Sequence, residues 1–288
     1  MGRRSGPPRR LAAADLRYAA AVADPSTKRP APALGLALLI ALMSLAPSSA
    51  AQARSSFVLA YPKQLGPQHA ATYDDAGVRI GGANLFIEKL PSGGIRLQTE
   101  SGRRSGARTI ATAELAPVVP GQSLRLVGQE SRSVDEQGHA LGVMRIDHLA
   151  GVARCLDRLG ATISEMRLPD EDRVVNVPLN LLFLPLVSGE VDSLDFQLFL
   201  CRPDARLIDF EAWIESGGSG SDDPIEIRYA PDFGFASPLA RTMVPKLSVW
   251  FDPMEPHAWQ AHRLPLYSGG PEVFVIRDDV SSTGLVDP

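Results

Sequence analysis

The stretch from Leu168 to Leu200 constrains the fold of this chain more than any other, because its hydrophobic period changes partway along. The run LNLLFLPL, residues 179–186, is apolar on nearly every side. Such a run predicts a short helix that must be covered by protein or by a ligand. Residues 191–200 alternate between apolar and polar side chains, which predicts a strand with one largely buried face.

Polar and proline residues are expected to set the ends of this helix. Asn176 is predicted to accept a hydrogen bond from the first-turn N–H groups. Pro178 suits an early helical position, because its missing N–H has no partner there in any case. Pro185 is expected to limit the length of the helix.

The rest of the chain is dominated by strand patterns separated by Gly-rich turns. Strands are predicted over residues 56–61, 84–90, 95–100, 123–134, 140–148, 152–156, 162–168, 206–215, 225–229, 247–251 and 273–277, the last as a closing or edge strand. About ten to twelve strands with a single helix predict a mainly β protein. The expected architecture is an antiparallel curved sheet, a half-barrel or a sandwich, with one short apolar helix.

The start of the chain has the pattern of an export signal. Residues 1–32 are rich in Arg, Ala and Pro, and the uncharged run ALGLALLIALMSLA follows at residues 33–46. A positive segment, an apolar core and the small residues of Ala51-Gln52-Ala53 are typical of a secretory signal peptide. We expect a signal peptide over 1–53, with an uncleaved inner-membrane anchor as the alternative, although a spanning helix needs roughly 20 apolar residues. The mature protein is then expected to be periplasmic or otherwise exported, and soluble.

Removing residues 1–53 leaves 235 residues, enough for a sizeable core. We expect one β-rich domain over 54–277, or two subdomains divided near residue 120, and a flexible tail over 278–288. The exported part keeps 22 Lys plus Arg (29 minus 7) and 31 Asp plus Glu (33 minus 2), a formal charge of about −9. A surface of that sign repels phosphates, so nucleic acid and anionic lipid headgroups are poor partners.

The central stretch resembles an uncharacterised family of exported bacterial envelope proteins. The resemblance covers roughly Ser123 to Ile276 and rests on Leu168-Pro169, Asn180 to Pro185, Gly189 and the strand that follows. That family is a domain of unknown function, β-rich and antiparallel, whose curved sheet is distantly similar to the lipoprotein carriers LolA and LolB. The resemblance implies a fold and a compartment, and no catalytic residues carry over from it.

Cys155 and Cys201 are the only cysteines in the chain. In an oxidising compartment two cysteines allow a single intramolecular pairing. A disulfide here would close a loop of about 45 residues and stabilise the fold by a few kcal/mol. The alternative is a pair of buried free thiols.

Motifs for catalysis are sparse. There is no G-x-S-x-G nucleophile motif, and Gly81-Gly82 and Gly93-Gly94 lack the spacing of a phosphate-binding loop. One cluster has the ligand types that zinc prefers, namely Asp252, Glu255, His257 and His262. The prolines among them favour an ordinary polar loop, so these four are weak metal candidates and no cofactor is expected.

Aromatic residues concentrate in the last third of the chain, at Phe233, Phe235, Trp250, Phe251, Trp259 and Tyr267. They suit either core packing or the wall of an apolar cavity that the leucine-rich helix would cover. If the second reading holds, the ligand-binding residues are Leu179, Leu182, Phe183, Leu186, Trp250 and Trp259.

Three functions are therefore open. The first is a non-enzymatic periplasmic protein that binds an amphipathic or lipid-like ligand, or an envelope partner, by burying apolar surface. The second is an envelope hydrolase or metal-dependent enzyme that uses the cluster from Asp252 to His262. The third is a structural assembly factor of the envelope, recognised through exposed sheet edges.

Overall fold

The computed structural model describes residues 55–103, 106, 108–201, 204–217, 222–232, 234, 247–265 and 271–280. The predicted signal peptide, the aromatic residues Phe233, Phe235 and Tyr267, and the tail from residue 281 lie outside the described residues. Residues Gln52–Pro288 form one unit. Strands on both sides of residue 120 belong to the same sheet.

The described residues are mainly β. In chain order the strands are β1 (Ser55–Ser56), β2 (Val58–Ala60), β3 (Gly66–Asp74), β4 (Arg79–Lys89), β5 (Ile95–Arg103), β6 (Arg108–Val119), β7 (Ser123–Val134), β8 (Ala140–Asp147), β9 (Val152–Leu156), β10 (Thr162–Arg167), β11 (Glu171–Asp172), β12 (Ser193–Leu200), β13 (Arg206–Ser216), β14 (Ile225–Pro231), β15 (Leu247–Phe251), β16 (Trp259–Pro265) and β17 (Glu272–Arg277). Two helical turns, α1 (Leu179–Leu182) and α2 (Leu184–Val187), form one short helical stretch between β11 and β12. No helix in the described ranges has the length and apolarity to span a bilayer.

Fifteen strands form one antiparallel sheet that is not closed into a barrel. Its order runs from β10 back to β3, crosses to β17, and then runs back to β12, while β2 pairs with β7. The sheet is therefore two meanders of hairpins joined through the β3–β17 pair, whose register sets Val275 opposite Thr72. The prediction of a mainly β fold with a curved antiparallel sheet and one short apolar helix is confirmed.

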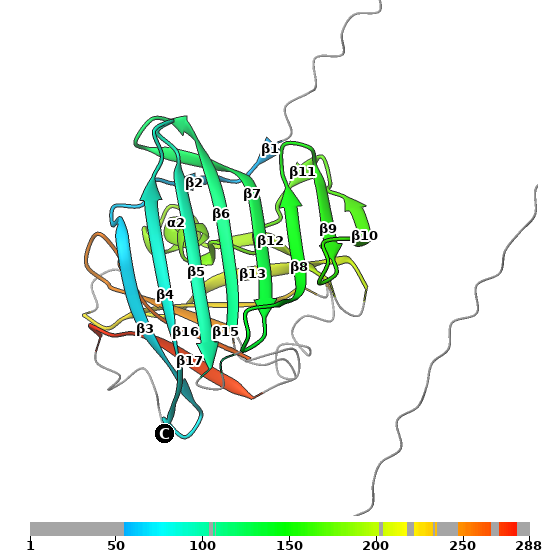
Figure 1. Ribbon diagram of the computed structural model, residues 1–288. Coiled ribbons are helices and arrows are strands. Elements are labelled where there is room, and N and C mark those ends of the chain that lie inside the picture. Colours follow the sequence, from blue (N-terminus) through cyan, green and yellow to red (C-terminus); the bar gives the residue numbers. More distant parts are fainter. Residues whose placement is uncertain are drawn as a thin grey trace, which may run out of the picture. The chain divides into compact units, whose positions relative to one another are not determined.

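The two meanders face each other around one hydrophobic core. Figure 1 shows β3 to β9 as a broad face, with the helix and β12 to β17 behind it. Inward side chains of both faces meet the helix in this core, in keeping with the alternation of side chains along a strand. The fully buried members include Ile95, Leu97, Leu124, Leu182, Phe183, Leu186, Phe196, Ile227 and Phe251.

The helical stretch packs inside this core. Phe183 is fully buried, and its ring centroid lies 5.7 Å from that of Phe196 and 5.5 Å from that of Tyr229. Pro185 was expected to limit the length of the helix, but it occupies the first turn of α2, where its missing N–H needs no partner, and α2 continues to Val187. The break falls at Phe183, which is both the C-cap of α1 and the N-cap of α2.

The predicted capping role of Asn176 is wrong. The N-cap of α1 is Pro178, and no side chain caps it. The Asn176 side chain instead donates to the carbonyl of Phe199 at 2.8 Å and accepts from its N–H at 2.9 Å. Since β12 is a sheet edge, these backbone groups of Phe199 have no strand on that side to pair with. The Asn176 amide supplies the partners that a strand would otherwise supply.

The strand predictions hold for most hairpins, but three long strands and the short β11 were not predicted. Strands β7 to β10 and β12 to β15 match the predicted ranges within a few residues. The alternating pattern did not reveal β3, β6 or β16, which hold small, polar or proline residues. Strand β17 is not an edge, since it lies between β16 and β3.

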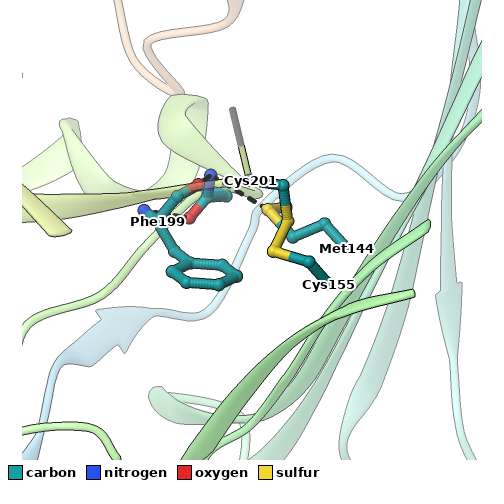
Figure 2. Close-up of a disulfide and its surroundings, with 5 residues drawn as sticks. Met144, Cys155, Phe199 and Cys201 are labelled. Atoms are coloured by element: carbon teal, nitrogen blue, oxygen red, sulfur yellow. Dashed lines mark hydrogen bonds between the residues drawn. A yellow bond between two sulfur atoms is a disulfide. The ribbon is translucent and has the colours of Figure 1, made fainter. Parts of the chain in front are cut away.

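The two ends of the sheet, near its edge strands β10 and β12, are joined by the segment before α1 and by a disulfide. We call this region the seam. The segment before α1 pairs with β12, because Val175 donates its N–H to the Gln197 carbonyl at 2.9 Å and Gln197 donates to Arg173 at 2.8 Å. A disulfide then links Cys155 in β9 to Cys201, the residue after β12. Figure 2 shows Met144 and Phe199 beside this disulfide. Both belong to a second, smaller core between the edges.

Candidate functional site

A partly enclosed cavity of about 240 Å³ lies on the inner side of the sheet, where β3 to β5 meet β15 to β17 and the start of α1. Its wall is formed by Ala70, Ala83, Asn84, Leu85, Thr99, Glu100, Ser101, Asn176, Val177, Pro178, Leu179, Asn180, Val249, Trp259, His262, Leu264 and Val275. The cavity therefore lies beside the hydrophobic core, next to the helix and not underneath it.

Small side chains account for the space. Ala70, Ala83 and Ser101 are cross-strand neighbours on β3, β4 and β5, so they share one face of the sheet. Further along β4, the inward positions Leu85 and Ile87 are larger and buried. Where small residues replace such side chains, the two faces of the sheet do not meet, and the gap forms the cavity.

The opposite wall combines apolar side chains with one imidazole. Val249, His262 and Val275 are cross-strand neighbours on β15, β16 and β17. Trp259 lies on the same wall, and its indole N–H donates to the Ala261 carbonyl at 3.0 Å, which holds the ring in place. Most of the exposed cavity wall is apolar, and its polar members are Asn84, Thr99, Glu100, Ser101, Asn176, Asn180 and His262.

Tyr229 forms a hydrogen bond with His262 from inside the core. The Tyr229 hydroxyl oxygen and His262 Nε2 lie 2.6 Å apart. Tyr229 is buried against the rings of Phe183, Phe196 and Phe210. Burial raises the pKa of the Tyr229 phenol, and burial lowers the pKa of His262 from 6.5 to about 4. Both groups are therefore uncharged at neutral pH.

The structure divides the six ligand-binding candidates into three groups. Leu179 and Trp259 line the cavity. Leu182, Phe183 and Leu186 are buried in the main core. Trp250 lies on the other face of the sheet, because it alternates with the inward residues Val249 and Phe251, and its ring is 6.4 Å from that of Phe274.

The four metal candidates each have a different environment. Glu255 pairs with Lys63 at 2.6 Å, and this contact holds the pKa of the Glu255 carboxyl below its usual value. The Asp252 carboxylate accepts from the Met254 N–H at 2.8 Å, and His257 Nδ1 lies 3.1 Å from the Asp252 carbonyl. His262 bonds Tyr229. Among the described residues, no three potential ligands gather around one point.

The segment that lines one end of the cavity is held by buried Gln129 on β7. The Gln129 amide oxygen accepts from the N–H groups of Asn176 and Val177, both at 2.8 Å. Its amide nitrogen donates to the Val174 carbonyl at 3.0 Å and lies 2.7 Å from His148 Nε2. A single side chain thus fixes the backbone of the cavity wall just before α1.

His148 continues this network. Because the Gln129 amide nitrogen can only donate, His148 Nε2 must accept, and its proton is on Nδ1, which lies 2.5 Å from the Asp172 carboxylate. Asp172 also accepts from the Val174 N–H at 3.1 Å. The sequence interpretation did not pair these residues, since they are 19 to 43 positions apart from Gln129.

Comparisons of the chain with protein-family models, with curated proteins and with solved structures found no match.

Proposed function

We propose that this protein binds a small, mainly apolar ligand in the cavity beside α1, without a covalent step. The observation that supports this most directly is an apolar pocket with a convergent polar group, His262, on its wall. Pockets of this kind, mostly apolar with a few placed polar groups, are the usual form of small-molecule sites. Affinity would come from removing apolar surface from water, at about 25 cal/mol per Å².

The volume of the cavity limits the size of the ligand that can bind. At about 240 Å³ it exceeds the roughly 150 Å³ engineered cavity that admits benzene, and it is smaller than the range of about 300 to 1,000 Å³ typical of drug-sized ligands. One aromatic ring or one short alkyl chain fits these limits better than several acyl chains. The proposal therefore favours a small amphipathic molecule over a whole lipid.

The proposed compartment is the periplasm. The apolar run at residues 33–46 supports export, and a disulfide between Cys155 and Cys201 suits an oxidising environment. Mass spectrometry of the protein purified from cell fractions would check both points. We expect a mature chain that begins after Ala53 in the periplasmic fraction, whereas an intact chain in the cytoplasm would contradict the assignment.

The binding proposal is tested by filling the cavity. Thr99 lines it, and the adjacent Gln98 is exposed on the opposite face of β5, so Thr99→Phe and Gln98→Phe form a matched pair. Titration of a small aromatic probe such as toluene, followed by the tryptophan fluorescence of the protein, to which Trp259 in the cavity wall contributes, should saturate for the wild type and for Gln98→Phe. Thr99→Phe should bind at least tenfold more weakly. Equal binding by both variants, or none by the wild type, would refute the proposed site.

A further inference from the structure

The Tyr229–His262 contact has a defined donor and acceptor. Tyr229 is buried, and the only hydrogen bond of its hydroxyl within the described residues is the 2.6 Å contact to His262 Nε2. If the imidazole donated, the buried phenol hydrogen would have no partner, which typically costs about 1–3 kcal/mol. The phenol therefore donates and Nε2 accepts.

This assignment places the imidazole proton on Nδ1. A neutral imidazole carries one N–H, so accepting at Nε2 leaves Nδ1 as the donor. Within the described part of the chain, Nδ1 of His262 has no hydrogen-bond partner. The side chain lines the cavity, so the ring brings one N–H donor to an otherwise mainly apolar wall.

We infer that the ligand of this cavity is an uncharged molecule with a carbonyl oxygen, which accepts the hydrogen bond of His262 Nδ1–H while its apolar part contacts Leu264, Val249 and Trp259. This inference rests on the proposed function and names the chemical class of its ligand. Short ketones, esters and amides belong to that class. Tyr229 acts here as a positioning residue, because it fixes which imidazole nitrogen faces the ligand as a donor.

The same wall disfavours an anionic ligand. A carboxylate buried without a paired charge loses far more hydration than one neutral hydrogen bond returns. Burial keeps His262 uncharged near neutral pH, so the imidazole does not supply that charge. Among molecules of equal size, the neutral carbonyl compound should therefore bind more tightly than the corresponding acid.

Isosteric ligands provide the test. Acetophenone and α-methylstyrene have nearly the same shape and differ by an oxygen in place of a methylene group. One net hydrogen bond of about 0.5–1.5 kcal/mol corresponds to a preference of roughly twofold to tenfold for acetophenone, measured by calorimetric or fluorescence titration of the full mature chain. Benzoate at pH 7 should bind at least tenfold more weakly than acetophenone.

Three variants assign the preference to the proposed donor. His262→Leu should bind both isosteres equally, and His262→Gln, which keeps an N–H donor, should retain part of the preference. Tyr229→Phe should also reduce the preference, because the imidazole proton is then free to move to Nε2. A thermal melt of each variant would show that it is folded.

The outcomes separate the two proposals. If the wild type binds both isosteres equally, or if the preference persists in folded His262→Leu, the carbonyl inference is wrong while the cavity remains a binding site. If benzoate binds as tightly as acetophenone, the inference is also wrong. If neither isostere binds the wild type, the proposed function itself fails.

Discussion

Gln129 shows how much of this fold depends on single buried polar groups. Its amide makes four contacts, to the backbone of Val174, Asn176 and Val177 and to His148 Nε2. Three of them join β7 to the segment that precedes α1, and the fourth joins β7 to His148, the residue after β8. A fully paired amide of this kind stabilises a specific arrangement, whereas removing it leaves several buried groups unpaired.

Replacing Gln129 with Ala should therefore lower the free energy of unfolding by about 2–4 kcal/mol, since two partly buried backbone N–H groups lose their acceptor and the buried Val174 carbonyl loses its donor. Urea denaturation of the variant measures the change. Gln98→Ala is the matched control, because Gln98 is an exposed glutamine on β5, and it should change stability by less than about 0.5 kcal/mol. Similar losses for both variants would show that the network contributes little.

His262 should make stability depend on pH. Its pKa is 6.5 when unfolded and about 4 when folded, so between these values the unfolded state binds more protons. The stabilising contribution is complete above pH 6.5 and is lost as the pH falls toward 4, by an amount on the order of 3 kcal/mol. Denaturation curves between pH 7.5 and 4 would measure it.

The control for this prediction is the difference between variants. Many carboxylates also titrate in this range. The relevant quantity is therefore the free energy of unfolding of the wild type minus that of His262→Gln, measured at each pH. That difference should grow as the pH rises from 4 to 6.5 and then level off. A difference that stays flat across the range would show that His262 is not desolvated in the folded protein.

The short helix contributes through packing more than through its own hydrogen bonds. Stretches of four residues do not form stable helices in water, so α1 and α2 depend on the surrounding sheet. Phe183, between them, contacts the aromatic rings of β12 and β14. Side chains from both faces of the sheet pack against this helical stretch.

Phe183→Ala should lower the free energy of unfolding by about 3–5 kcal/mol, because the side chain is fully buried and its removal leaves a cavity. Chemical denaturation measures this loss. Leu159→Ala is a suitable control, since Leu159 is 84% exposed and its truncation should change stability by less than about 0.5 kcal/mol. A loss under 1 kcal/mol for Phe183→Ala would mean that the core closes around the gap.

At the level of strands, prediction succeeded where apolar and polar residues alternate and a turn signal follows. The hairpin of β7 and β8 has both, and its predicted bounds differ from the observed ones by one residue at most. Strand β3 reads GPQHAATYD, and its inward positions include alanine and threonine. Small side chains weaken the hydrophobic pattern, and the same small side chains create the cavity. The pattern did not predict β3, and the small side chains that hid this strand are the reason that it lines the site.

At the scale of the whole molecule, the two edge strands of the sheet do not pair with each other, and side chains hold the two ends of the sheet together. Strands β10 and β12 are its two edges, and the segment held by Gln129 lies along β12. The Cys155–Cys201 disulfide adds a covalent link across a separation of 46 residues. Together these contacts keep the two faces of the sheet around one core.

The double variant Cys155→Ala, Cys201→Ala should lower the free energy of unfolding by about 3–4 kcal/mol, as expected for a loop of this length. Comparison with the wild type under reducing conditions separates loss of the bond from loss of the sulfur atoms. Reduction should destabilise the wild type by a similar amount and leave the double variant unchanged. No response of the wild type to reductant would indicate that the bond contributes little to the folded state.

The amino-acid sequence by itself determined the class of fold, the number and length of most hairpins, and the apolar helix, because these follow from the local period of side chains. Only the tertiary structure decided which strands became edges, which polar residues met in the seam, and where the small residues of β3 to β5 left space beside His262. The physical reason is that these features depend on pairing between residues far apart in the chain. No local pattern records, for example, that Tyr229 would lie against His262.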